Sequence, residues 1–207
     1  MTLVAISAAY GAAGSVIGPA LAERLDVPFL DRAIPVAVAE ELEVPLDDAL
    51  AHHEGEAAPG LLERLLAAFA GADTGGLAPL PAELVTSEDF HRATRDVLLR
   101  HAQSGAGVIL GRGAVAALRD DPRVLRVRLT GPRGARERQA VALGQVSAET
   151  AATALRRLDQ AHGEYLRRFY EVSIDDPSLY HLVLDSTTFT PQACVELITA
   201  ATGQLGH

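Results

Sequence analysis

The chain has 207 residues, of which 48% are hydrophobic, 22% charged and 4% aromatic, as is typical of a globular protein with a sizeable core. The formal net charge of −9 argues against a broad surface for nucleic acid or anionic membranes, which would need a basic excess. All 18 basic residues are arginines, and this excludes a Schiff-base lysine and the lysine that grips phosphate in a P-loop.

The single cysteine and the amino-terminal residues indicate the compartment. Cys194 lies in an apolar helical pattern, so we expect it in the core of a protein kept in a reducing environment. The amino terminus lacks the basic region of a signal peptide, and residues 3–9 are too few to span a bilayer. The sequence therefore predicts a cytoplasmic protein with no membrane partner.

Short apolar runs alternate with segments of helical spacing along most of the chain. In chain order we expect a strand at 3–7, a helix at 15–25, a strand at 27–30, helices at 33–43 and 87–103, strands at 108–110 and 124–129, helices at 132–143 and 148–169, a strand at 181–184 and a helix at 191–201. The strand at 124–129 carries two arginines, Arg126 and Arg128. Strands that alternate with helices predict an α/β fold whose mostly parallel sheet is covered on both faces.

The composition changes in the middle of the chain. Residues 52–60 are rich in Gly, Ala, Glu and Pro, and residues 71–81 contain three glycines and two prolines. The segment between them, 61–70, is short and amphipathic. We therefore predict a mobile insert or lid arm with weak structure over residues 44–85. The adjacent histidines His52 and His53 lack the spacing of metal ligands.

The junction between the first strand and the first helix is built from small residues, Tyr10 to Gly18. At such a junction, backbone N–H groups and a helix N-terminus can be presented to a phosphate. The pattern departs from the strict P-loop rule: with Ser15 in the Ser/Thr register, Gly14 occupies the lysine position. In the same register Ala8 and Ala13 replace the two glycines. The alternative interpretation is a tight strand–helix turn with no ligand.

A dinucleotide site competes with phosphate binding at this junction. Asp31 follows Gly11 by 20 residues at the end of a predicted second strand, as in dinucleotide-binding folds. The glycine spacing is Gly-x-x-Gly-x-x-x-Gly instead of Gly-x-Gly-x-x-Gly. Phosphate binding is therefore the preferred interpretation.

Arginines supply two further candidate sites. Arg112 stands between two glycines at the end of a predicted strand, where ligands of α/β proteins collect and where its planar fork could hold a phosphate. The two helices within 132–169 also concentrate arginines. Because Arg138 points about 200° away from Arg136 on an ideal helix, they cannot all face one ligand. A solvated face with Glu–Arg pairs is the alternative for most of them. The candidate residues carried by this helix pair are Arg136, Arg138, Arg156, Arg157, Asp159, His162, Arg167 and Arg168.

Taken in order, these segments resemble the cytidylate kinase-like family of the P-loop nucleoside monophosphate kinase superfamily. The resemblance extends over almost the full length, apart from residues 44–85. The segments that carry it are Ser7–Gly18, Leu21–Leu25, Pro28–Asp31, Gly111–Gly113, Arg136, Asp159 with Tyr165, and Asp176–Asp185.

The resemblance implies a three-layer kinase-like fold that occupies residues 1–207 as a single domain. Within it, residues 44–85 would be a mobile helical insert that forms the acceptor arm, and residues 132–170 would be lid-like helices. It further implies ATP and Mg²⁺ as cofactors and a small-molecule nucleotide as the partner; the negative net charge already argues against nucleic acid. The phosphate-binding residues it implies are Gly11, Ala12, Ala13, Gly14 and Ser15, with Ser15 also on Mg²⁺; Arg112, Arg136, Arg157 and Asp159 are implied as catalytic, and Asp31, Arg32, Arg112 and His162 as acceptor-binding.

The chain also departs from the family pattern. Its loop lacks the usual basic residue, and the family's Asp-x-x-Arg appears as Asp159-Gln160-Ala161-His162. Two functions therefore follow from the sequence. One is a cytidylate-like kinase that transfers a phosphoryl group from ATP to a nucleoside monophosphate or similar small acceptor. The alternative is a catalytically impaired nucleotide-binding or regulatory pseudo-kinase. A homodimer is compatible with either function.

Overall fold

Five parallel strands form the central sheet of the protein in a computed structural model that describes residues 2–30, 87–111 and 113–205. The strands are β1 (Leu3–Ala8), β2 (Phe29–Leu30), β3 (Gly107–Leu110), β4 (Val124–Thr130) and β5 (Leu182–Asp185), and their order in the sheet is β2-β3-β1-β4-β5. The described helices are α1 (Gly14–Leu25), α5 (Ser87–Ser104), α6 (Ala114–Ala117), α7 (Arg133–Ala142), α8 (Ala151–Tyr170), the 3-10 helix η2 (Pro177–Leu179) and α9 (Pro191–Thr202).

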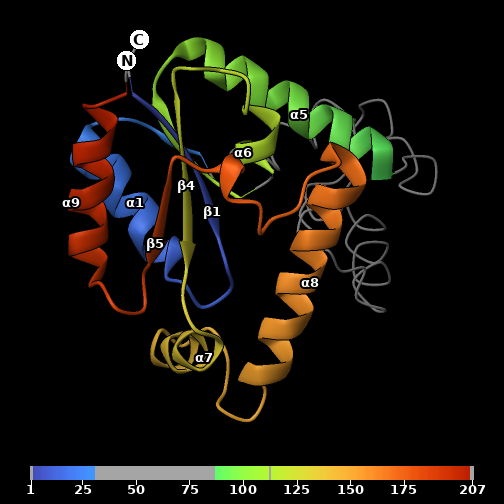
Figure 1. Cartoon of the computed structure of the whole chain (residues 1–207), viewed down its shortest axis with the longest axis vertical. Helices are drawn as coiled ribbons and strands as arrows, with labels where there is room; N and C mark the ends of the chain where they lie inside the picture. Colours follow the sequence, from blue (N-terminus) through green and yellow to red (C-terminus); the bar gives the residue numbers. More distant parts are fainter. Residues whose placement is uncertain (1, 31–86, 112, 206–207) are drawn as a thin grey trace, which may run out of the picture. The chain divides into compact units, whose positions relative to one another are not determined.

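Strand β1 lies at the centre of the sheet, between β3 and β4. Leu3 is paired with Gly107 of β3 and with Val124 of β4, and all strand pairs are parallel. The carboxyl ends of the strands therefore meet at one edge, where α/β proteins bind ligands. Figure 1 shows α7 beyond this end of β4, with α8 beside the strands.

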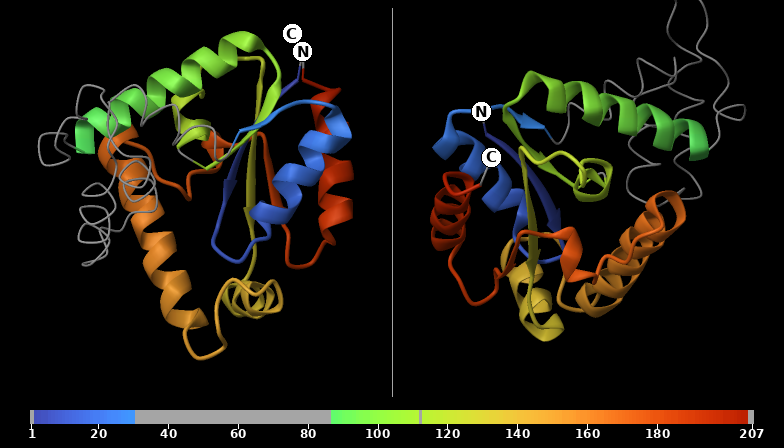
Figure 2. Two further views of the ribbon diagram at one scale, coloured as in Figure 1. Left: turned by 180° about the vertical axis from the view of Figure 1, so that it is seen from behind. Right: turned by 45° about the horizontal axis from the view of Figure 1, so that its top comes forward.

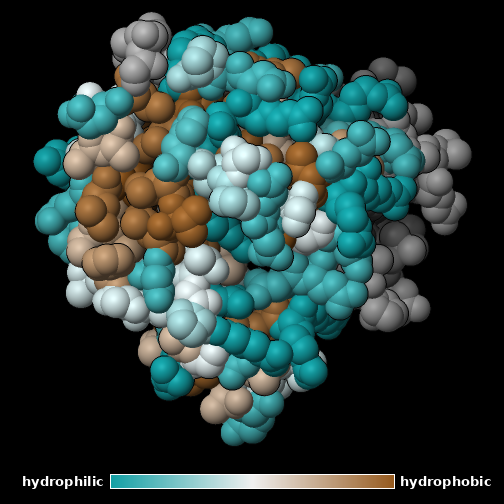
Figure 3. Space-filling view, in the orientation of Figure 1, coloured by the Kyte–Doolittle hydropathy of each residue, from teal (hydrophilic) through white to brown (hydrophobic). Residues whose placement is uncertain are grey.

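One face of the sheet is covered by α1 and α9, which lie side by side in Figure 2. Val4, Ile6, Val127 and Leu129 project from the strands into an apolar cluster with both helices. Cys194 of α9 is fully buried in this cluster, as the helical pattern predicts. Figure 3 shows an apolar patch on the surface over α9 and β5. The exposed apolar side chains of these elements and of their connection are Val183, Phe189 and Leu197.

The opposite face carries a different set of side chains because alternate residues of a strand point in opposite directions. Ser7 of β1 and two arginines of β4, Arg126 and Arg128, lie on this side. Helix α6 packs against β1 and α8 here. Leu118 and Leu166 are buried apolar residues outside the cluster that α1 and α9 form.

The chain divides into two compact units, residues 1–31 with 98–207 and residues 32–97. The predicted helix at 33–43 and the predicted insert at 44–85 lie outside the described residues. The α/β class and the parallel sheet are confirmed. The sequence analysis missed α6, which has four residues, and η2. Among the described helices, none has both the length and the apolar composition needed to cross a bilayer.

Candidate active site

The loop that joins β1 to α1 is shaped by small residues in left-handed conformations. Gly11 has φ 77° and Ala13 has φ 54°. A Cβ atom on Gly11 would collide with the carbonyl oxygen of Arg136, and one on Gly14 would lie 2.6 Å from the Cβ of Ala8. The glycines of the predicted motif are therefore required by close packing around the loop as well as by backbone conformation.

The loop presents backbone donors at the N-terminus of α1. The amides of Val16 and Ile17 donate to the Ala13 carbonyl at 3.0 and 2.9 Å. Those of Ala13, Gly14 and Ser15 have no acceptor within the described part of the chain. Ala13 and Gly14 are buried, and buried amides without an acceptor are costly. With the positive end of the helix dipole, these three N–H groups form a place that an anion can occupy.

The connection from β5 to α9, which follows Asp185, is hydrogen-bonded to the loop between β1 and α1. The Ser186 hydroxyl donates to the Ala12 carbonyl at 2.8 Å, and Ser186 is 2% exposed. The Ala9 amide donates to the carbonyl of Leu129 on β4 at 2.9 Å. The sequence analysis did not single out Ser186. Its position directly after a predicted strand that ends at Asp185 is the signal that could have found it.

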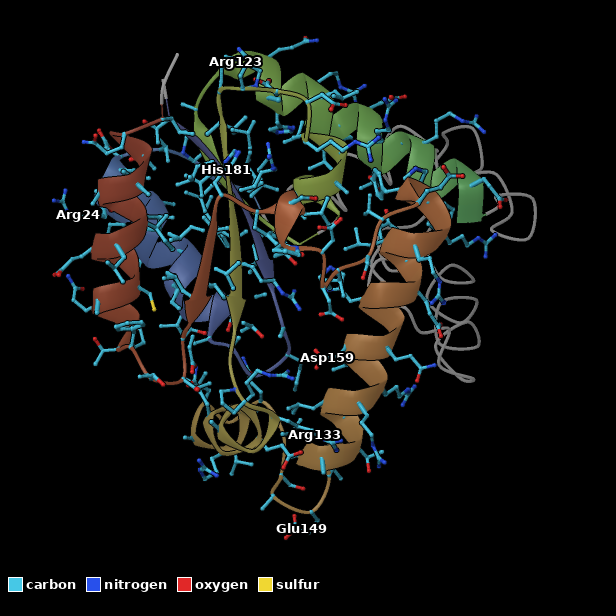
Figure 4. The ribbon with its side chains drawn as sticks, viewed as in Figure 1. Arg24, Arg123, Arg133, Glu149, Asp159 and His181 are labelled. Carbon is cyan, nitrogen blue, oxygen red and sulfur yellow. The ribbon has the colours of Figure 1, made fainter. Side chains whose placement is uncertain are left out.

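An ion pair between two of the predicted residues is anchored on the loop. Arg136 Nη1 donates to Asp159 Oδ2 and to the Tyr10 carbonyl, both at 2.8 Å, and Arg136 Nε donates to the Gly131 carbonyl at 3.0 Å. Asp159 Oδ1 accepts the Tyr10 amide at 3.0 Å. Figure 4 shows Asp159 on the side of α8 that faces the strands. The pair thus joins α7, α8 and the start of the loop.

Arg157 lies on a different side of α8 from Asp159. It lines an open surface hollow together with Thr153, Arg156, Gln160 and Glu164. Two residues along an α-helix correspond to a rotation of about 200°. The structure therefore brings Arg136 and Asp159 together at the loop and does not place Arg157 with them.

Ser15 offers an exposed hydroxyl at the start of α1. Gln145 Nε2 donates to Ser15 Oγ at 3.1 Å, and the Tyr10 hydroxyl donates to the Gln145 carbonyl at 3.4 Å. No group of three or more His, Cys, Asp or Glu side chains that could hold a metal occurs among the described residues. The donor set fits a Mg²⁺ ion that takes one ligand from Ser15 and the others from phosphate oxygens and water.

His162 follows Asp159 by three residues on α8 and is partly buried. Burial and the nearby Arg128 guanidinium lower the pKa of His162 to about 4, and the Asp159 carboxylate acts in the opposite direction. The imidazole is therefore neutral at pH 7 and adds no positive charge to the site.

The remaining predicted residues, Asp31, Arg32 and Arg112, lie outside the described residues. The two glycines on either side of Arg112 are both in left-handed conformations, with φ 73° at Gly111 and 69° at Gly113. They stand at the carboxyl end of β3, beside β1.

The strand order β2-β3-β1-β4-β5 and the small-residue loop after the central strand agree with the nucleoside monophosphate kinase-like fold of P-loop kinases, which the solved structures below share. A family model narrows this class: the model of the cytidylate kinase-like family matches residues 3–188, and the chain belongs to this family. A search of curated proteins finds no match.

Solved structures agree on the fold. An uncharacterized protein from Eubacterium ventriosum ATCC 27560 has a TM-score of 0.67 at 14% identity, with 99% of each chain covered. A shikimate kinase from Bacteroides thetaiotaomicron has a TM-score of 0.53 at 14% identity, with 98% of each chain covered. A shikimate kinase from Acinetobacter baumannii in complex with shikimate has a TM-score of 0.50 at 16% identity, covering 100% of this chain and 96% of that one.

Proposed function

We propose that the protein transfers a phosphoryl group from ATP to a nucleoside monophosphate or a similar small acceptor in the cytoplasm. The observation that carries the proposal is the loop between β1 and α1, where the amides of Ala13, Gly14 and Ser15 have no acceptor among the described residues. Amides arranged in this way at a helix N-terminus bind phosphate without needing a lysine side chain.

The remaining residues supply positioning and charge, which dominate the catalysis of phosphoryl transfer. In the proposal, Gly11, Ala12 and the three amides hold the phosphates of ATP, and Ser15 holds Mg²⁺. When bound, Mg²⁺ would neutralise charge on the phosphate oxygens. Arg136 is fixed by the Tyr10 carbonyl and by Asp159, so its guanidinium is held in place beside the loop without reorganisation.

In the proposal, the phosphoryl acceptor is bound by residues outside the loop between β1 and α1. Asp31, Arg32, Arg112 and His162 are assigned to the acceptor, and Arg157 to the phosphates when the ligand is bound. The partner is a small nucleotide, and neither nucleic acid nor a membrane takes part.

A catalytically impaired nucleotide-binding protein is the second candidate, and the ion pair at the loop favours it. The Asp159 carboxylate occupies the Tyr10 amide and one nitrogen of Arg136. Gly14 stands where a P-loop has its lysine. A loop with neither a basic side chain nor a free Arg136 can bind a nucleotide but would stabilise the charge of the transition state poorly.

A coupled assay and phosphorus NMR with ATP, Mg²⁺ and a panel of nucleoside monophosphates test both candidates. We expect turnover that falls by about 10²-fold in Ser15→Ala. It should be unchanged in Ser178→Ala, an exposed serine of η2 whose backbone N–H is bonded to Asp176. Saturable ADP binding without turnover for any acceptor would support the second candidate. Absence of ADP binding in a thermal-shift titration would contradict both.

A further inference from the structure

Arg128 of β4 is a buried cation with an incomplete set of hydrogen bonds. Arg128 is 8% exposed, and its Nη1 donates to the Ser7 hydroxyl at 2.8 Å. Its Nε and Nη2 groups have no acceptor among the described residues. A guanidinium carries five N–H donors and is expensive to bury unless they are satisfied. Most of the binding capacity of this side chain is therefore unused by the protein itself.

Arg126, two residues earlier on the same face of β4, shows how the fold satisfies an arginine that has only a structural role. Its Nε donates to the Leu179 carbonyl and its Nη1 to the Arg119 carbonyl, both at 2.8 Å. These bonds join β4 to η2 and to the segment after α6. Arg128 has no such bonds to backbone carbonyls within the described residues, so holding the fold together does not explain it.

No close carboxylate among the described residues balances the charge of Arg128. No acidic side chain of the described residues lies within ion-pair distance of it. The two carboxylates that act on it through space are Asp159, which is already paired with Arg136 at 2.8 Å, and Asp175, which is exposed. Burial lowers the pKa of Arg128, which agrees with a charge that the surroundings do not compensate.

The free nitrogens of Arg128 remain within reach of a ligand. None of them is among the fully buried polar atoms that lack a partner in the described part of the chain, so they keep contact with solvent. The Ser7 hydroxyl contacts the guanidinium directly, and His162 and Tyr180 lie close enough for its charge to act on their pKa values. Ser7 also lies three residues before the loop amide that Asp159 binds, so this position adjoins the proposed ATP site.

We propose that Arg128 binds the oxyanion of the phosphoryl acceptor, a phosphate or carboxylate group, which completes the hydrogen bonds that Ser7 leaves open. The assignment to the acceptor rests on the proposed function, whereas the anion site itself stands on the geometry of Arg128. The planar guanidinium suits bidentate contact with either group. An acceptor without an oxyanion, such as a free nucleoside, would leave the cation unpaired and would be rejected.

The direct test uses the full chain labelled with ¹⁵N-arginine and follows the Nε–Hε signals by NMR. The signals of Arg128 and Arg126 are identified by their loss in Arg128→Met and Arg126→Met. Inorganic phosphate and acetate are added separately at constant ionic strength, with ADP present so that the loop is already filled. We expect a saturable shift of the Arg128 signal, by phosphate for a phosphate-bearing acceptor or by acetate for a carboxylate-bearing one. The Arg126 signal should not move.

Thermal unfolding separates binding from a structural role. Because Arg128→Met removes an unpaired buried charge, its Tm without phosphate should equal or exceed that of the parent protein. Arg126→Met leaves two carbonyl groups without donors and should lower the Tm by several degrees. Where turnover is found, Arg128→Met should raise the KM for the acceptor by about tenfold or more, with the KM for ATP unchanged.

Each outcome decides between the proposals. An Arg128 signal that neither anion shifts would overturn the oxyanion site, even if ADP binds and turnover is found. An Arg128 signal that phosphate shifts in a protein unable to bind ADP would uphold the site and remove the kinase proposal. A large fall in Tm of Arg128→Met together with an unchanged acceptor KM would show that Arg128 is structural.

Discussion

The two faces of the sheet use the same strands for different purposes, and β4 shows this residue by residue. Val127 and Leu129 enter the apolar cluster with α1 and α9, whereas Arg126 and Arg128 project from the other side. Ser7 of β1 joins the polar side, while its neighbour Ile6 is in the apolar cluster. The alternation of strand side chains thus places apolar packing on one face of the sheet and polar, charged groups on the other.

This separation is consistent with the proposal that an acidic, lysine-free chain binds phosphate at the loop after β1. The candidate loop begins at the end of β1, where one face supplies a rigid apolar support and the other supplies arginines and a histidine. Hydrogen bonds hold the loop backbone at two points. The Ser186 hydroxyl, in the β5–α9 connection, binds the Ala12 carbonyl, and Arg136 and Asp159 bind the Tyr10 backbone. A ligand at the loop therefore meets preformed donors, which cost little to reorganise.

The largest expected effect lies on the apolar face. Ile198 of α9 is fully buried in the cluster, and its neighbour Leu197 is 42% exposed. Ile198→Ala should lower the free energy of unfolding by about 3 kcal/mol because it leaves a cavity, and Leu197→Ala should lower it by less than about 1 kcal/mol. Urea unfolding of both variants measures the difference. Equal losses would show that α9 does not anchor this face.

A pH-dependent loss of stability is expected on the polar face. His162 has a pKa lowered to about 4 by burial and by Arg128, against about 6.5 in an unfolded chain. The unfolded state binds the proton between these values, so the stabilisation is full above pH 6.5 and is lost as the pH falls towards 4. The loss amounts to at most about 3 kcal/mol.

Urea unfolding of the parent protein and of His162→Gln between pH 7 and pH 4 measures this term. Carboxylates titrate in both proteins, so the difference between the two curves isolates the histidine. We expect the parent to lose more stability than the variant, and Arg128→Met to narrow the window because one cause of the lowered pKa is removed. Parallel curves for the parent and His162→Gln would show that the imidazole is solvated as in an unfolded chain.

The order of strands and helices could be predicted because apolar periodicity is a local signal. The predicted helix boundaries differ from the observed ones where a turn precedes the helix. Helix α8 begins at Ala151 and not at 148, because Ser147 and Thr150 form a turn before it that is closed by a 3.2 Å hydrogen bond. Helix α6 was missed because four residues carry no period, and η2 because Asp176 and Pro177 are equally typical of a simple turn.

The candidate site could be predicted only in part, for a different reason. Small residues after a buried strand mark the loop in the sequence itself. The role of Arg128 depends on which groups face it from β1, α8 and the segment after η2, and no local pattern contains that information. Arg136 and Asp159 were both selected from the sequence. Their ion pair, and the hydrogen bonds that each makes to the Tyr10 backbone, are tertiary contacts that no local pattern contains.

The smallest expected effect is the difference in stability between glycine variants of two alanines in the loop between β1 and α1. Ala12 and Ala13 are both buried, at 0% and 2% exposure, but only Ala13 is left-handed, with φ 54°. Alanine at such a position costs about 1 kcal/mol, which glycine does not pay. Both glycine variants lose a buried methyl group and gain freedom in the unfolded state, so Ala12→Gly should be the less stable by about 1 kcal/mol. Chemical unfolding checks this difference, and an Ala13→Gly variant as unstable as Ala12→Gly would contradict the left-handed assignment. ADP affinity should hold in Ala13→Gly, because the amides that would bind phosphate keep the same backbone path.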